Sequence, residues 1–187
     1  MKNIFDKAVE FATKAHEGQM RKDGTAYITH PLEDASIVGT MTNDPEVLAA
    51  AVLHDTVEDT SVTPQDILDN FGKRIAELVA HETENKRRGQ KPSDTWKIRK
   101  QESLAVLKEA GVETKMLWLG DKLSNMRSLA REYDKEGVDV FKKFNENDPK
   151  EQFWYYSTVL EYIKELKDEP AYKEYEQLIH HIFDGLI

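Results

Sequence analysis

Residues 54–59, His-Asp-Thr-Val-Glu-Asp, place one imidazole and three carboxylates at the end of an apolar run. The run, from Ala49 to Leu53, is typical of a buried helix, so the side chains that follow it are expected to be partly buried. Buried carboxylates require partners. A divalent cation would supply one, because the adjacent His54 and Asp55 offer it a nitrogen and a hard oxygen. The alternative is an acidic helix end that is solvated and binds nothing.

The geometry of this acidic segment depends on where its helix ends. If the helix continues, His54 and Glu58 lie one turn apart on one face, as do Asp55 and Asp59. If it ends near Thr56, the last two carboxylates enter a loop at the helix C-terminus, where the helix dipole disfavours negative charge. The segment alone therefore leaves a metal site and a solvated helix end open.

Two further positions carry candidate ligands. His30 stands before a proline, outside the helix expected to carry His54, and its alternative role is that of a core histidine bonded to the backbone. Asp121 lies within an apolar helical run, where an unpaired aspartate would be costly. A buried ion pair with Lys122 or Arg127 would also account for it.

Nearly every element that must position these residues is predicted to be helical. Thr63 is a suitable N-cap before Pro64, and Gly72 is expected to end the same helix. Alternating strand patterns with turn dipeptides are absent, and residues 86–94 are expected to form a long loop. The sequence predicts an all-α fold of about nine or ten helices, over residues 4–15, 32–41, 45–55, 64–71, from about 73, 94–110, 114–133, 136–144, 149–168 and 171–185.

The composition excludes several classes of protein. The 187 residues are 39% hydrophobic and 33% charged, which is typical of a soluble globular protein. The sequence contains no run of about 18 apolar residues, so no membrane-spanning helix is predicted. The charged N-terminal helix is unlike a signal peptide, so a cytoplasmic location is expected. The absence of cysteine excludes disulfides and thiolate chemistry. A net charge of −9 disfavours nucleic acid as a partner, although a local basic patch could receive a phosphate-rich small molecule. The oligomeric state is left undetermined.

Four motifs stand in order between residues 15 and 129: A-H-E-G-Q-M-R-K-D-G-T-A-Y-I-T-H-P-L, L-H-D-T-V-E-D-T, F-G-K-R-I-A-E-L-V and L-G-D-K-L-S-N-M-R-S-L. Together they resemble the HD superfamily of metal-dependent phosphohydrolases. More narrowly, they resemble the hydrolase domain of RelA/SpoT proteins in its stand-alone form, the small alarmone hydrolases. The resemblance implies an HD-domain helical bundle in which residues 1–187 form one hydrolase domain. Residues 15–129 would contain the motifs and form the core of the domain. The C-terminal helices, within residues 136–187, would pack on it.

The resemblance also implies a chemistry for these motifs. One metal ion, usually manganese, would be held by four ligands: His30, His54, Asp55 and Asp121. Glu58 and Asp59 would handle the water that this ion activates. The implied reaction is hydrolysis of guanosine 3′,5′-bis(diphosphate), (p)ppGpp, at the 3′-pyrophosphate to GDP or GTP plus pyrophosphate. The implied substrate contacts are Arg21, Lys22, Asn125 and Arg127.

Departures from the family pattern keep alternatives open. Residues 86–100 are basic where the family has a short Val-Thr-Lys element, and they form either a cover over a polyphosphate or a solvated loop and helix face. Gly120 and Lys122 stand where long members usually carry alanine and arginine. The same site would suit a phosphatase on another nucleotide, such as NADPH at its 2′-phosphate. It would also suit a sensor that binds metal and nucleotide without turnover, although intact Glu58 and Asp59 disfavour this.

Overall fold

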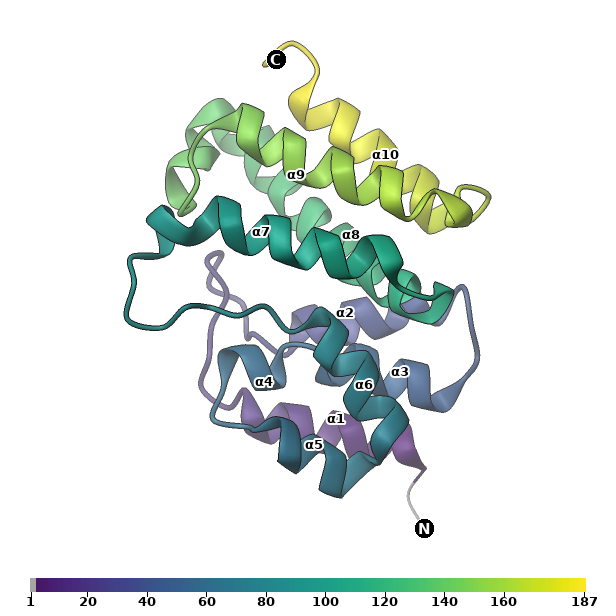
Figure 1. Cartoon of the computed structure of the whole chain (residues 1–187). Helices are drawn as coiled ribbons and strands as arrows, with labels where there is room; N and C mark the ends of the chain where they lie inside the picture. Colours follow the sequence, from purple (N-terminus) through teal and green to yellow (C-terminus); the bar gives the residue numbers. More distant parts are fainter. Residues whose placement is uncertain (1–2) are drawn as a thin grey trace.

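Ten α-helices make up most of residues 3–187, the part of the chain that this computed structural model describes (Figure 1). No β-strand occurs in these residues, so the predicted all-α fold is confirmed. None of the described helices is long and apolar enough to cross a membrane. The elements, with two 3₁₀ segments labelled η, are α1 (Ile4–Ala15), α2 (Thr29–Val38), α3 (Pro45–Leu53), α4 (Thr56–Asp59), α5 (Pro64–Phe71), α6 (Lys73–Glu82), α7 (Pro92–Glu109), α8 (Val112–Glu136), η1 (Gly137–Lys143), α9 (Pro149–Tyr162), η2 (Lys164–Leu166) and α10 (Pro170–Phe183).

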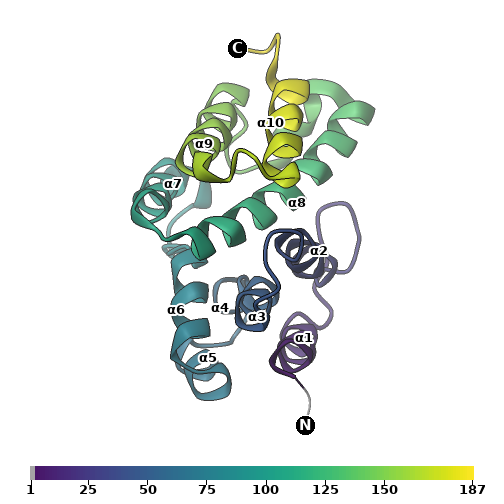
Figure 2. The ribbon, with the colours of Figure 1, turned by 90° about the vertical axis from the view of Figure 1, so that its right-hand side faces the viewer.

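The helices form two groups that meet along α8 (Figures 1 and 2). Helices α1 to α6 lie in one half of the molecule, and α7, α9 and α10 lie in the other half. Each half has its own apolar core, one around Leu53 and Ile75 and the other around Tyr175. The long helix α8 contributes Leu117 to the first core and Trp118 to the second. Because α2 packs against both α3 and α8, these three helices meet at the boundary between the halves.

Local signals account for where α5 begins and ends. The hydroxyl of Thr63 accepts a hydrogen bond from the backbone N–H of Asp66, whose carboxylate accepts one from the N–H of Thr63. Pro64 occupies the first helical position, where its missing N–H costs nothing. Gly72 ends the helix at φ 84°, a left-handed conformation that favours glycine. The predicted cap and helix end are therefore confirmed.

Several helix boundaries differ from the predictions. Helix α2 begins at Thr29, so His30 lies in its first turn, where the proline after it is tolerated. Helix α3 ends at Leu53 and the short α4 follows, so the acidic segment is neither a continuous helix nor a loop. The helix predicted over 136–144 is mostly the 3₁₀ segment η1, and the one predicted over 149–168 is α9 followed by η2.

Candidate metal centre

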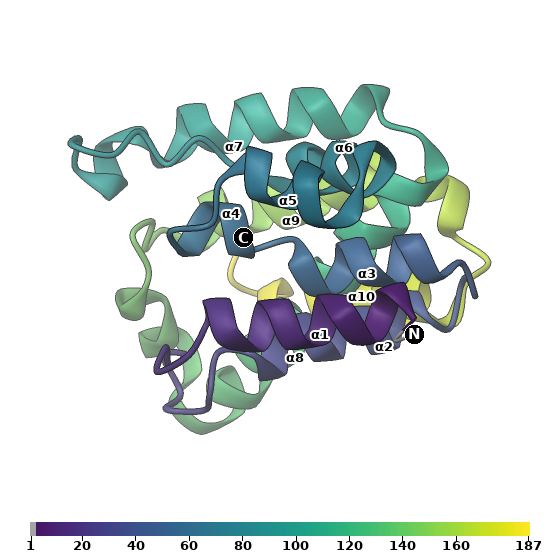
Figure 3. The same ribbon diagram turned by 90° about the horizontal axis from the view of Figure 1, so that it is seen from below.

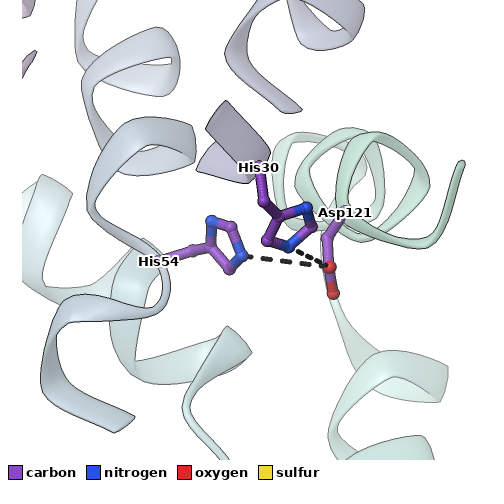
Figure 4. Close-up of side chains that lie close together, drawn as sticks. All are labelled: His30, His54 and Asp121. Carbon is purple, nitrogen blue, oxygen red and sulfur yellow. Dashed lines mark ion pairs between the residues drawn. The ribbon is translucent and has the colours of Figure 1, made fainter. Parts of the chain in front are cut away.

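Three helices bring two imidazoles and a carboxylate to one buried point. His30 comes from the first turn of α2, His54 directly follows α3, and Asp121 lies in the middle of α8 (Figure 4). One ligand atom from each lies within 4.8 Å of the others, and no side chain of the three is more than 8% exposed. His30 Nε2 lies 3.1 Å and His54 Nε2 lies 3.9 Å from Asp121 Oδ1.

Asp55 supplies a fourth donor to this cluster. Its Oδ2 atom lies 3.1 Å from His54 Nε2 and 3.5 Å from His30 Nε2. The hydroxyl of Tyr27 lies 2.7 Å from the same oxygen and 2.9 Å from Asp59 Oδ2, so it can donate to either carboxylate. Burial would raise the pKa of Asp55, but the two histidines outweigh it and hold the pKa below its usual range. Asp55 thus lies beside both histidines, and one of its carboxylate oxygens is also within 4.8 Å of one each from Glu58 and Asp59.

The hydrogen bonding of His54 leaves one nitrogen free for a cation. Its Nδ1 lies 2.7 Å from the backbone carbonyl of Ala51 and donates to it, whereas the buried Nε2 has no hydrogen-bond partner. Burial would lower the pKa of His54, but Asp55, Asp34 and Asp121 outweigh it and raise the pKa well above its usual value. A divalent cation would satisfy the same carboxylates in place of that proton. The residues present therefore fit a metal ion.

The ion pair considered as an alternative for Asp121 is also present. Lys122 Nζ pairs with Asp121 Oδ2, while Oδ1 faces His30 and accepts a hydrogen bond from Asn125 Nδ2 at 2.6 Å. Burial would raise the pKa of Asp121, but Lys122 and the histidines lower it well below its usual value. One oxygen of Asp121 thus has a cation from the chain itself, and the other faces the candidate ligands.

The four predicted ligands line a cavity with a volume of about 180 Å³. Glu58 and Asp59, on α4, line the same cavity. Lys86 Nζ lies 2.6 Å from Glu58 Oε1 and 3.3 Å from Asp59 Oδ1. The backbone N–H of Glu84 donates to Glu58 Oε2 at 2.7 Å. Burial and the charge of Asp55 raise the pKa of Glu58, against the opposite effect of Lys86. The two acids are therefore held at the edge of the metal cluster by a lysine and a backbone amide.

The connections around this cavity gather at one side of the molecule. Figures 1 and 3 place α4 at the same end as the connections 16–28 and 83–91. Of the basic segment 86–100, Lys86 and Lys100 line the cavity. Part of that segment therefore faces the acids.

A second cavity, of about 230 Å³, adjoins the first and shares Tyr27, His30 and Asn125 with it. Arg21 Nη2 lies 3.2 Å from Ser128 Oγ and 3.4 Å from Asn125 Oδ1. We name this second cavity the Arg21 cavity. It is lined by Arg21, Lys22, Asp23, Tyr27, His30, Asn125, Ser128, Leu129, Glu132, Phe144 and Tyr156. Basic and aromatic groups therefore stand directly beside the metal cluster.

Two predicted substrate contacts differ in their placement. Lys22 lines the Arg21 cavity, and its ammonium group donates to the backbone carbonyl of Lys143 at 3.0 Å. Arg127 lines neither cavity, because its guanidinium group bonds Glu174 at 2.6 and 2.7 Å and Glu33 at 3.0 Å. The structure thus brings three of the four predicted substrate contacts to one cavity and holds Arg127 elsewhere.

Several side chains in the first cavity are absent from the sequence-based predictions of the site, among them Tyr27, Lys86 and Glu82. Tyr27 stands three residues before His30 in the first family motif, but no role was assigned to it. Lys86 was part of the basic run but was not distinguished within it. Glu82 ends α6 without any motif, and burial and Asp121 raise its pKa to about 8. Tertiary contact, and not local pattern, brings these groups to the site.

Comparison with known proteins decides the family. A sequence profile described as HD domain matches residues 8–148. The chain belongs to the HD domain family. All four predicted ligands, His30, His54, Asp55 and Asp121, lie within the matched part of this HD domain.

The curated relatives of this HD domain are much longer proteins. It is 40% identical over 121 residues to the bifunctional (p)ppGpp synthase/hydrolase SpoT of Escherichia coli K12, a match that covers 63% of this chain and 17% of SpoT. It is 32% identical over 130 residues to a GTP pyrophosphokinase of Myxococcus xanthus, covering 68% of this chain and 17% of that protein. The chain therefore spans about a sixth of the length of these relatives.

Two solved structures resemble this HD domain over nearly their whole length. The protein lmo0812 of Listeria monocytogenes EGD-e is 32% identical, with a TM-score of 0.72 over 87% of this chain and 98% of that one. A metazoan ortholog of SpoT, described as hydrolysing ppGpp, is 23% identical, with a TM-score of 0.71 over 100% of this chain and 98% of that one. The second likeness shows the fold, an all-α HD domain bundle.

In this HD domain a further buried carboxylate contacts His54 from the side away from the cluster. Asp34 of α2 is 0% exposed, and its Oδ2 lies 3.2 Å from His54 Nδ1. Apart from this contact, neither oxygen of Asp34 has a partner, and burial raises its pKa well above the usual value. Gly120 of α8 makes the room, because a Cβ there would overlap Asp34 Oδ1 and lie 2.8 Å from Val38 Cγ2. Any side chain at position 120 would therefore clash with the carboxylate of Asp34.

Gly120→Ala is expected to destabilise the HD domain by about 1–3 kcal/mol, because overpacking outweighs the roughly 1 kcal/mol that alanine gains over glycine in a helix. Chemical denaturation measures the free energy of unfolding. In an Asp34→Ala background the overlap with Oδ1 is gone, so the same substitution should cost much less. An equal loss in both backgrounds would contradict this steric account.

Proposed function

We propose that this HD domain hydrolyses (p)ppGpp at its 3′-pyrophosphate, with residues 1–187 acting as one hydrolase domain. The observation that carries the proposal is the shared wall of the two cavities, formed by Tyr27, His30 and Asn125. A polyphosphate nucleotide needs a cation and acids at the reacting phosphorus, and basic and aromatic groups around the rest of the molecule. The similarity to SpoT of E. coli, a (p)ppGpp synthase/hydrolase, supports this substrate class.

Four side chains would hold one divalent cation, for which we propose Mn²⁺: His30, His54, Asp55 and Asp121. Two imidazole nitrogens and two carboxylates accept Mn²⁺ as well as Fe²⁺ or Zn²⁺, and the choice of Mn²⁺ rests on the family resemblance. When bound, such an ion lowers the pKa of water from about 15.7 toward neutrality. The unpartnered Nε2 of His54, buried between two carboxylates, supports this ligand set.

Glu58 and Asp59 would position the attacking water and accept its proton. The raised pKa of Glu58 makes it a stronger base than an ordinary glutamate. Lys86 keeps it beside the candidate ligands. The water oxygen bonds to the phosphorus next to the 3′-oxygen, and the bond between that phosphorus and the 3′-oxygen breaks. The 3′-oxygen takes up a proton, so that GDP or GTP and pyrophosphate are released. Arg21, Lys22 and Asn125 would hold the nucleotide during this step.

Turnover tests the proposal directly. Metal-stripped protein with added Mn²⁺ is incubated with ppGpp and, separately, with NADPH, and release of pyrophosphate and of phosphate is followed. We expect pyrophosphate from ppGpp, and only when Mn²⁺ is added. Phosphate released from NADPH alone would move the substrate to a 2′-phosphorylated nucleotide. Bound Mn²⁺ without turnover of either compound would favour a sensor.

Arg21→Gln is expected to raise the KM for ppGpp by roughly 30-fold, because a charge-assisted hydrogen bond to phosphate is worth about 2 kcal/mol. The Mn²⁺ affinity should stay unchanged, since Arg21 contacts no ligand of the cluster. Arg131→Gln is a matched control: Arg131 also donates to Ser128 Oγ, at 2.9 Å, but it is exposed and does not line the Arg21 cavity. Steady-state kinetics of the two variants separate the roles, and equal effects would remove Arg21 from the substrate site.

A further inference from the structure

A chain of hydrogen bonds links His30 to a carboxylate on the side away from the cluster. His30 Nδ1 lies 2.8 Å from Ser124 Oγ, and this serine donates to Glu33 Oε2 at 2.8 Å. The other oxygen of Glu33 accepts a hydrogen bond from Arg127 Nη1 at 3.0 Å. Glu33 and His30 belong to α2, and Ser124 and Arg127 belong to α8, so the chain crosses the contact between these two helices.

The direction of each hydrogen bond in this chain follows from the number of hydrogens available. The Glu33 carboxylate, paired with Arg127, can only accept. The single hydroxyl hydrogen of Ser124 therefore goes to Glu33, and the serine oxygen can only accept from His30. Nδ1 of His30 must then carry hydrogen, and in the neutral ring Nε2 keeps its lone pair. Nε2 is the atom that lies 3.1 Å from Asp121 Oδ1 in the cluster.

We propose that Glu33, acting through Ser124, is a positioning residue that selects the metal-binding tautomer of His30. Arg127 holds Glu33 in place through an ion pair, and Glu174 fixes Arg127 from the other side. This inference rests on the metal-binding part of the proposed function and is independent of the substrate. It gives Arg127 a role three hydrogen bonds behind a metal ligand, in place of a contact with nucleotide.

His54 provides an internal reference for this proposal. Its Nδ1 is held by the backbone carbonyl of Ala51 at 2.7 Å and by Asp34 at 3.2 Å. Neither contact involves Glu33 or Ser124. Substitution of Glu33 or Ser124 should therefore change the tautomer of His30 and leave that of His54 unchanged.

The first test reads the tautomers of the neutral rings by long-range proton–nitrogen NMR correlations on metal-free protein. In the native chain we expect His30 to carry its hydrogen on Nδ1. In Glu33→Gln the new amide can donate to Ser124, which frees the serine hydrogen for His30 Nδ1, so the form with hydrogen on Nε2 should increase. The proposal is overturned if native His30 carries hydrogen on Nε2, or if Glu33→Gln leaves the ring unchanged.

The second test measures the dissociation constant of Mn²⁺. Loss of the outer partner of a metal-bound histidine typically weakens metal binding about 10- to 100-fold, and we expect this for Ser124→Ala and Glu33→Gln. Glu33 is half-buried at the helix surface, so its variant should fold even if Ser124→Ala does not. An unchanged constant in Glu33→Gln would overturn the proposal.

Two control variants have matched chemistry. Ser157→Ala removes a half-buried hydroxyl that bonds only within α9, and Glu161→Gln alters an acid of α9 whose ion pair, with Lys164, has no contact with Glu33 or Ser124. Both should bind Mn²⁺ like the native chain to within about threefold, well short of the loss expected for an outer partner. If the native chain binds no Mn²⁺ at all, the proposed function fails, and the NMR result still decides the tautomer.

Discussion

His54→Gln is expected to bind Mn²⁺ at least about 100-fold more weakly than the native chain, because losing a direct ligand should cost no less than losing an outer partner. Turnover of ppGpp should fall by about a thousandfold or more, since a bound cation contributes several kcal/mol to stabilisation of the transition state. The physical reason is the position of His54 Nε2, which is buried, has no hydrogen-bond partner and lies 3.1 Å from Asp55 Oδ2. Titration with Mn²⁺ and a turnover assay measure the two effects.

His180→Gln is the matched control for this prediction. His180 is exposed on α10, where it contacts Asp184, so its variant should keep native Mn²⁺ affinity and native turnover. Removing the metal from the native chain with a chelator should reproduce the loss seen in His54→Gln, and added Mn²⁺ should restore only the native chain. A His54→Gln protein with full metal content and full activity would remove His54 from the ligand set.

Most helices could be predicted because their limits are set by local chemistry. The cap at Thr63, the proline after it and the left-handed Gly72 act within a few residues of one another, so the sequence shows where α5 begins and ends. The start of α2 is less visible, because a proline one residue after His30 is compatible both with a loop and with a first helical turn. No local signal marks the break between α3 and α4.

The site was predicted unevenly for a similar reason. Asp121 and Asn125 are four residues apart, about 40° around α8, whereas Arg127 is about 120° from Asp121 in the opposite sense. The helical geometry alone thus separates Arg127 from the cavity, and only the family resemblance had placed it there. The outer partners of the histidines had no such signal, since Ser124 and Glu33 are 91 residues apart and meet only in the folded chain.

Glu58→Gln is expected to lower kcat for ppGpp by about 10²- to 10⁴-fold, the usual contribution of a general base. The amide preserves the shape of the side chain and can still accept the hydrogen bond from the backbone N–H of Glu84, but it cannot take a proton from water. Mn²⁺ affinity should stay within about threefold, because Glu58 is not one of the four ligands. Single-turnover kinetics and Mn²⁺ titration on the same sample measure both quantities.

The pH dependence distinguishes a base from a merely structural acid. Burial and the charge of Asp55 raise the pKa of Glu58 above its usual value, and a base works only when deprotonated. Turnover by the native chain should therefore fall as the pH drops through that raised pKa, and Glu58→Gln should lose this acidic limb along with its rate. Glu102→Gln, an exposed acid paired with Arg87, should change neither. If Asp59→Asn loses the limb and Glu58→Gln keeps it, the proton is taken by Asp59, which shares Lys86 with Glu58.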